Sequence, residues 1–226
     1  MLNEFIFLAS CLATASFTLL SLFFGAEGLL AAVCVQGLLE NLFVVKQMQL
    51  FGLHVTCADV FAVGLVFALN LMQEFYGQAK AVRAIWCYFG VSLWFLAART
   101  AHLMYEPSVF DCTHQHFVQI LDSCPRIIFA SLATSLVALH LDRSVYAYMR
   151  TFFNGRSAWI CNIASIATSQ LFDTILFTYL ALYRSIANPV HIILVSYTVK
   201  LIAILLAGPF AALARPIFKL QQARDL

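Results

Sequence analysis

The sequence predicts an all-α membrane protein, a polytopic transmembrane helical bundle of six to seven spans. Of its 226 residues, 62% are hydrophobic and only 11% are charged, and the mean hydropathy is +0.88. A typical soluble domain is about 45–50% apolar and about 25% charged. A chain of this size cannot bury so much apolar surface in one core. Lipid must therefore solvate the rest, and backbone groups in lipid must pair within helices.

Seven apolar runs are long enough to cross a bilayer, since roughly 20 helical residues span its ~30 Å hydrocarbon layer. Turn and helix-ending signals separate them at Gly25-Ala26-Glu27-Gly28, Tyr76-Gly77, Asn154-Gly155-Arg156 and Asn188-Pro189. Gly208-Pro209 is expected to kink or end the last helix. Without the short first run, six spans remain, and either way residues 1–226 form a single transmembrane domain. The expected spans are Phe5–Phe24, Gly28–Val45, Thr56–Gln73, Ala84–Leu103, Ser123–Leu141, Trp159–Tyr183 and Val190–Leu213.

Basic residues predict the orientation of the bundle, because cytoplasmic loops carry an excess of Lys and Arg. With seven spans, the segments after the third, fifth and seventh lie on one side, which should be cytoplasmic. The N-terminus is then expected outside and the C-terminus in the cytoplasm. The start of the chain lacks the basic region of a cleavable signal, so the first run should be retained as a helix. The basic residues in question are Lys80, Arg83, Arg143, Arg150, Arg156, Arg215, Lys219 and Arg224.

Polar side chains recur along the sixth span. Asn162, Ser165, Ser169 and Asp173 follow one another at intervals of three, four and four residues, which places them on one stripe of a helix. Trp159 lies at the edge of this stripe, and Gln170 flanks it. A charged group at mid-bilayer costs about 2.5–3.5 kcal/mol or more, so such groups usually face the interior and serve a function. The serines alone are as well explained as small residues for helix packing.

The last span carries Tyr197 and Lys200 one turn apart. Lys200 and Asp173 each lie ten residues from the expected outer end of their span, or about 15 Å deep at 1.5 Å per residue. A short loop joins the two spans, so they should be antiparallel neighbours. We therefore predict an ion pair between Asp173 and Lys200.

The second and third spans add further polar groups. Asp59, Asn70 and Glu74 fall within about 60° of one another on a helical wheel. Glu40 and Asn41 lie near the outer end of the second span. Together with the last two spans, these helices are expected to line a polar cavity.

Several kinds of chemistry are not expected. The net charge of +2 is too weak for direct nucleic-acid binding. The seven cysteines show no CxxC spacing, and the loop cluster of Asp111, Cys112, His114 and His116 lacks the usual spacing of zinc ligands. We expect no metal site and no cofactor, and we leave a disulfide between Cys112 and Cys124 open. Walker A, HExxH and G-x-S-x-G motifs are absent, so the chain is not expected to be an enzyme.

The polar residues of the first half resemble those of the queuosine-precursor transporters, formerly called putative vitamin uptake transporters. Asn41, Lys46, Gly52, Thr56 and Asp59, followed by Gln73-Glu74-Phe75-Tyr76-Gly77 and Ala81, are similar to the first half of that family. In the second half, Asp142, Trp159 and Asn162 precede Ser169-Gln170, Asp173-Thr174 and Phe177, and Tyr197 and Lys200 match a Y-x-x-K element. The resemblance covers about residues 39–216. This chain differs at Asn70, where many members carry Asp, and in its additional first span at about residues 5–24.

The resemblance implies a multi-pass protein of the cell (inner) membrane that imports a purine-like small molecule. The cargo would be 7-cyano-7-deazaguanine, 7-aminomethyl-7-deazaguanine or queuine, salvaged for the queuosine modification of tRNA. Asp173 or Glu74 would accept hydrogen bonds from the base edge, and Trp159, Phe172 or Tyr197 would stack on the ring. The full set of expected substrate-binding residues is Asn41, Asp59, Asn70, Glu74, Trp159, Asn162, Ser169, Gln170, Asp173, Tyr197 and Lys200.

Alternative functions remain open at this level. The chain could be the substrate-binding membrane subunit of a multi-component vitamin importer, or, as a weaker alternative, an intramembrane enzyme. The sequence also leaves open facilitated or ion-coupled transport, and a homo-oligomer. Besides the substrate, the expected partner is the lipid bilayer.

Overall fold

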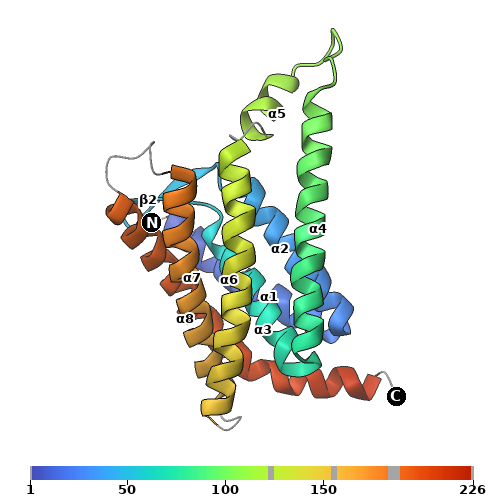
Figure 1. The fold of residues 1–226 in the computed structure, drawn as a ribbon, viewed down its shortest axis with the longest axis vertical. Coiled ribbons are helices and arrows are strands. Elements are labelled where there is room, and N and C mark those ends of the chain that lie inside the picture. The colour runs from blue at the N-terminus through green and yellow to red at the C-terminus, as the bar shows by residue number, and fades with distance from the viewer. Residues whose placement is uncertain (1, 122–124, 154–156, 183–188, 225–226) are drawn as a thin grey trace.

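The computed structural model describes residues 2–121, 125–153, 157–182 and 189–224. Helices make up nearly all of this part of the chain, as Figure 1 shows. In chain order the elements are α1 (Leu2–Phe23), α2 (Gly25–Phe43), β1 (Gln47–Leu50), β2 (Leu53–Thr56), α3 (Asp59–Tyr76), α4 (Gln78–Leu103), α5 (His114–Leu121), α6 (Pro125–Phe152), α7 (Ala158–Phe177), the π-helical turn η1 (Thr178–Leu182) and α8 (Pro189–Arg224).

The predicted transmembrane helical bundle is confirmed. Six helices of the described chain are long and apolar enough to cross a membrane, namely α1, α2, α3, α4, α7 and α8. The remaining long helix, α6, has 28 residues, or about 42 Å at 1.5 Å per residue. Figure 1 shows α6 running the length of the bundle between α4 and α7. We therefore treat it as the seventh span.

The two ends of the bundle differ in composition. Helix α1 begins at the level of β2, which is the first end, and α8 finishes at the second, opposite end (Figure 1). We call the first the hairpin end, after β1 and β2. The second is the basic end, and it carries Lys80, Arg83, Arg150, Arg215 and Lys219.

Two of the predicted breaks contain glycines that the turns require. Gly25 and Gly77 have φ angles of 84° and 86°, a region in which a Cβ atom is strongly disfavoured. They separate α1 from α2 and α3 from α4. The predicted break at Asn154-Gly155-Arg156 lies outside the described residues. The last helix does not end at Pro209 but continues to Arg224, and Figure 1 shows its red C-terminal part lying across the basic end.

The prediction of helices alone missed a β-hairpin. Strands β1 and β2 pair antiparallel, with Gln47 opposite Thr56 and Leu50 opposite Leu53. Phe51 and Gly52 between them both have positive φ, at 52° and 79°, as a type I′ hairpin turn requires. Helix α3 consequently begins at Asp59 rather than at Thr56. Eight strand residues are too few to stand out from the apolar runs on either side of them.

Helix α1 holds this hairpin in place. The Asn3 side-chain amide donates to the Gln49 carbonyl at 2.8 Å, and the Phe51 amide donates to the Glu4 carboxylate at 3.2 Å. The additional first helix therefore orders a segment that it does not adjoin in sequence.

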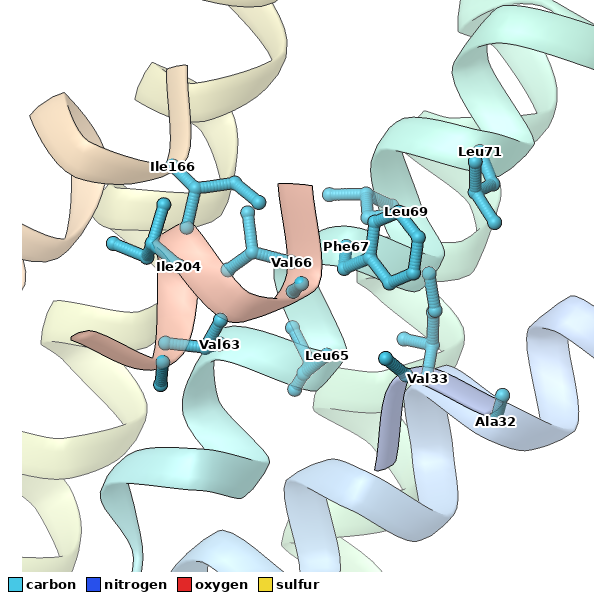
Figure 2. Packing of buried hydrophobic residues seen from close by; sticks show 14 of the residues in the cluster. Ala32, Val33, Val63, Leu65, Val66, Phe67, Leu69, Leu71, Ile166 and Ile204 are labelled. Atoms are coloured by element: carbon cyan, nitrogen blue, oxygen red, sulfur yellow. The ribbon is translucent and has the colours of Figure 1, made fainter. Parts of the chain in front are cut away.

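Helix α3 is the centre of the bundle. It packs against α1, α2, α4, α6, α7 and α8, and most of its residues are buried on every side. Figure 2 shows Val66 directed toward Ile166 of α7 and Ile204 of α8, with Leu65 nearer Val33 of α2. A helix that is buried on every side and mostly apolar is typical of such a central position.

Close packing between α2 and α4 gives a stability prediction. A Cβ atom on Gly37 would overlap the ring of Tyr88, a side chain that is only 2% exposed and has no room to move. We expect Gly37→Ala to lower the free energy of unfolding by about 1–3 kcal/mol through overpacking. Gly90→Ala on α4 is the matched control, because no atom lies within 4 Å of its added Cβ. Thermal unfolding in detergent measures both, and equal melting temperatures for the two variants would contradict the prediction.

Candidate functional site

A large pocket lies at the hairpin end of the bundle. Its volume is about 690 Å³, and its walls come from the hairpin, α2, α3, α6, α7 with η1, and α8. Pockets for small molecules typically measure about 300–1,000 Å³ and combine apolar walls with a few convergent polar groups. The site is therefore large enough for a bicyclic ligand.

The predicted ion pair is confirmed in the wall of this pocket. The ammonium of Lys200 on α8 donates to Oδ2 of Asp173 on α7 at 2.9 Å. Their side chains are 7% and 11% exposed, and both line the pocket. Burial in lipid-covered protein strengthens the attraction between them, because little water screens it.

Two further carboxylates line the same pocket. Asp59 at the start of α3 accepts a long hydrogen bond of 3.4 Å from the hydroxyl of Ser196, and its Oδ2 has no hydrogen-bond partner within the described part of the chain. Glu40, near the end of α2, also faces the pocket. Three carboxylates against one ammonium give a formal charge of −2, with the histidines taken as neutral.

Some of the lining residues were not predicted as site residues. Glu40 belongs to a helix that is expected to line a polar cavity, but it is not among the predicted substrate-binding residues. The hairpin contributes His54 and Thr56, and α6 contributes Ser131 and Thr134. No periodicity in the sequence marks these residues, since the hairpin itself was missed and single hydroxyl groups are common in membrane helices.

Below the pocket, toward the basic end, buried polar groups form a layer between α3, α6 and α7. The Asn70 amide donates to Oδ1 of Asn162 and to the hydroxyl of Ser165, each at 3.0 Å. The hydroxyl of Ser169 donates to Oδ1 of Asp142 at 3.3 Å. Gln170 is also buried in this region, at 3% exposure. The stripe predicted on the sixth span therefore faces the interior.

Glu74 lies outside the pocket, near the basic end. Its carboxylate accepts hydrogen bonds from Arg150 at 2.6 Å and from the hydroxyl of Tyr146 at 2.9 Å. Arg215 of α8 approaches the same carboxylate at 3.6 Å. We call these four residues the inner cluster. It ties α3, α6 and α8 together, and a role for Glu74 in substrate binding stays a prediction.

Three other predicted residues do not line the pocket. Asn41 links α2 to α6 by accepting a hydrogen bond from Ser131 at 3.0 Å. Tyr197 donates its hydroxyl to the Ala167 carbonyl of α7 at 3.2 Å. Trp159 is 48% exposed near the start of α7. Their roles in binding stay predictions.

In the loop before α5, Asp111 acts as a helix cap. Its Oδ1 accepts hydrogen bonds from the amides of Thr113 and His114. These bonds, led by the one from the Thr113 amide, hold the pKa of Asp111 below its ordinary value. Cys124 lies outside the described residues, so its pairing with Cys112 stays a prediction.

Comparison with known proteins agrees with the resemblance. The model of the family described as "Putative vitamin uptake transporter" matches residues 56–214. A protein of Bacillus subtilis (strain 168) named "Probable queuosine precursor transporter" is 33% identical over 195 residues, which cover 85% of this chain and 85% of that protein. No solved structure matches the chain.

Proposed function

The chain belongs to the family described as "Putative vitamin uptake transporter", and on that premise we propose that it imports a queuosine precursor, a 7-deazaguanine, for tRNA modification. The Asp173–Lys200 pair in the wall of the pocket is the observation that carries this proposal. The protein is a multi-pass membrane transporter, and a stand-alone secondary carrier is the form that we favour.

The ion pair complements the edge of a guanine-like base. Such an edge presents a carbonyl oxygen, an N1–H and an exocyclic amine side by side. The ammonium of Lys200 would donate to the carbonyl, while Asp173 would accept from both N–H groups. A carboxylate has about four lone-pair sites, so Asp173 can bind the base without releasing Lys200. Charge-assisted hydrogen bonds of this kind are roughly twice as strong as neutral ones.

The remaining negative charge favours a cationic cargo. Glu40 and Asp59 line the pocket in addition to the Asp173–Lys200 pair, and a buried charge is costly unless it is paired. Of the three precursors, 7-aminomethyl-7-deazaguanine carries a primary ammonium and queuine a bulkier secondary one, whereas the 7-cyano form is neutral. We propose that Glu40 and Asp59 bind the primary ammonium.

A competition assay tests this preference. We expect 7-aminomethyl-7-deazaguanine to inhibit labelled uptake at a concentration at least about tenfold lower than the 7-cyano compound, since a charge-assisted hydrogen bond contributes about 1.5–3 kcal/mol and 1.4 kcal/mol is a tenfold change. Glu40→Gln combined with Asp59→Asn should remove most of this difference. Equal inhibition of the parent protein by both compounds would contradict the preference but not the transport function.

The positions of the pocket and the inner cluster support an alternating-access mechanism. The pocket lies at the hairpin end, and the inner cluster joins three helices near the basic end. We propose that the hairpin end faces outside and the basic end faces the cytoplasm of the cell (inner) membrane, as the basic residues predict. Asn70, Asn162, Ser169 and Gln170 would then contact the base on its way inward.

Uptake into proteoliposomes tests the proposed function. The purified protein is expected to accumulate or exchange labelled 7-deazaguanine, while protein-free liposomes do neither. Release of a chemically changed product would instead indicate an enzyme. Exchange that requires additional subunits would indicate the substrate-binding part of a larger importer.

A further inference from the structure

Asp142 on α6 is a fully buried carboxylate outside the proposed substrate pocket. It is 0% exposed, and none of the ion pairs between described residues includes it. Oδ1 accepts the hydroxyl of Ser169 at 3.3 Å, while Oδ2 has no hydrogen-bond partner among the described residues. An ionised carboxylate held in this way is costly, by several kcal/mol. A bound cation or a proton would remove that cost.

Two hydroxyls and an amide surround the Asp142 carboxylate. Ser165 and Asn70 lie beside the carboxylate, in addition to Ser169. Asn70 is 1% exposed, and its Oδ1 also lacks a partner in the described chain. Oδ2 of Asp142 and the hydroxyls of Ser165 and Ser169 are hard oxygen ligands, which suit a hard monovalent cation, whereas soft metals prefer sulfur and imidazole ligands.

Charged neighbours on the packed helices are engaged elsewhere. Glu74 of α3 belongs to the inner cluster, and Asp173 of α7 pairs with Lys200 of α8. On α6 itself His140 and Arg143 flank the residue, but neither lies within ion-pairing distance of its carboxylate in the described structure. The charge of Asp142 is therefore not balanced by these side chains.

Asp142 also lies midway between the pocket and the inner cluster. On α6 it is eight residues after the pocket residue Thr134 and eight before Arg150, or about 12 Å from each at 1.5 Å per residue. Ser169, its hydrogen-bond partner, is one turn from Asp173. A site in this position can be reached from either end as the helices rearrange.

We propose that Asp142 is the coupling-cation site of this carrier, where a proton or Na⁺ binds during import. The inference rests on the proposed transport function. The cation joins Oδ2 of Asp142 when the site is open to the outside, which neutralises the carboxylate. After the rearrangement it is released to the cytoplasm, and the carboxylate regains its charge. Its downhill movement drives accumulation of the substrate.

In proteoliposomes, substrate transport and its coupling to a cation gradient can be measured separately. Equilibrium exchange of labelled 7-aminomethyl-7-deazaguanine needs no gradient, whereas net accumulation is measured with an inward gradient of either H⁺ or Na⁺. With the membrane potential held at zero, a tenfold gradient of the coupling cation should give about tenfold accumulation at one cation per substrate, because the two gradients then store equal free energy. The gradient that drives accumulation, H⁺ or Na⁺, identifies the coupling cation.

Asp142→Asn is expected to retain exchange within about threefold while its accumulation ratio falls to about 1, since a neutral amide cannot bind and release the charge. Ser144→Ala, an exposed residue of the same helix whose hydroxyl bonds only to the His140 carbonyl among the described residues, is the matched control and should accumulate normally. If Asp142→Asn loses both exchange and accumulation, the Asp142→Glu variant tests the proposal instead. Its displaced carboxylate should shift the half-saturating cation concentration at least about threefold.

Three results overturn the proposal. The first is accumulation by the unmodified protein that neither gradient increases. The second is gradient-driven accumulation by Asp142→Asn at the unmodified level, and the third is an unshifted cation dependence in Asp142→Glu. Absence of exchange in the unmodified protein would instead remove the proposed transport function, and this inference with it.

Discussion

Replacing Asp173 with Asn is expected to lower the kcat/KM for 7-deazaguanine uptake by at least about 100-fold. The variant loses the carboxylate that is proposed to accept two hydrogen bonds from the base, each worth about 1.5–3 kcal/mol. It also leaves the ammonium of Lys200, which is 7% exposed, without its partner. Breaking a buried ion pair from one side costs about 3–5 kcal/mol, so thermal stability should fall as well.

Two further variants distinguish the loss of substrate binding from the loss of stability. Thr168→Val on the same helix is the matched control, because its hydroxyl donates to the Ala164 carbonyl of its own helix. It should keep both uptake and stability. Exchanging the charges, Asp173→Lys with Lys200→Asp, should recover stability relative to either single variant without restoring uptake. Normal uptake by Asp173→Asn would remove this residue from the proposed binding site.

Replacing Glu74 with Gln is expected to open the basic end of the bundle. The Glu74 side chain is 11% exposed and the side chain of its partner Arg150 is 21% exposed, so we expect a loss of about 2–3 kcal/mol of stability, less than for a fully buried pair. Arg215 is 57% exposed and should add little. A shift of about 2 kcal/mol raises the population of an open state roughly 30-fold.

The rate at which Cys161 reacts with a maleimide measures this opening of the basic end. This cysteine is 0% exposed and lies near both Glu74 and Arg150. With the other six cysteines replaced, its labelling by a maleimide should be slow in the parent protein and about 10–100-fold faster in Glu74→Gln, in proportion to the open population. Glu27→Gln, an exposed carboxylate at the same end, should not change the rate. Equal labelling of all three proteins would show that the inner cluster does not close this end.

The sequence alone predicts the contact of Asp173 correctly but not that of Glu74. The pairing of Asp173 with Lys200 followed from equal depth in two helices joined by a short loop. Because helix geometry is regular, the depth of a residue can be counted along the chain. Glu74 shares a helical face with Asp59 and Asn70, so the same reasoning placed it in the cavity. In the structure it lies 15 residues along α3 from Asp59, about 22 Å at 1.5 Å per residue, and bonds to Arg150 and Tyr146.

The sequence by itself determined the helical spans, the glycine-bounded turns and the ion pair. The spans and turns depend on local hydrophobicity and turn residues, and the ion pair depends on equal depth in two consecutive spans. Only the tertiary structure decided that the hairpin and Glu40 line the pocket. It also decided that Glu74 pairs with Arg150 and that Asp142 accepts a hydrogen bond from Ser169. The Glu74–Arg150 contact joins residues 76 positions apart, and Glu40 and Lys200 of the pocket are 160 positions apart. These contacts depend on how each helix rotates and packs against α3, and no periodicity within one segment encodes that rotation.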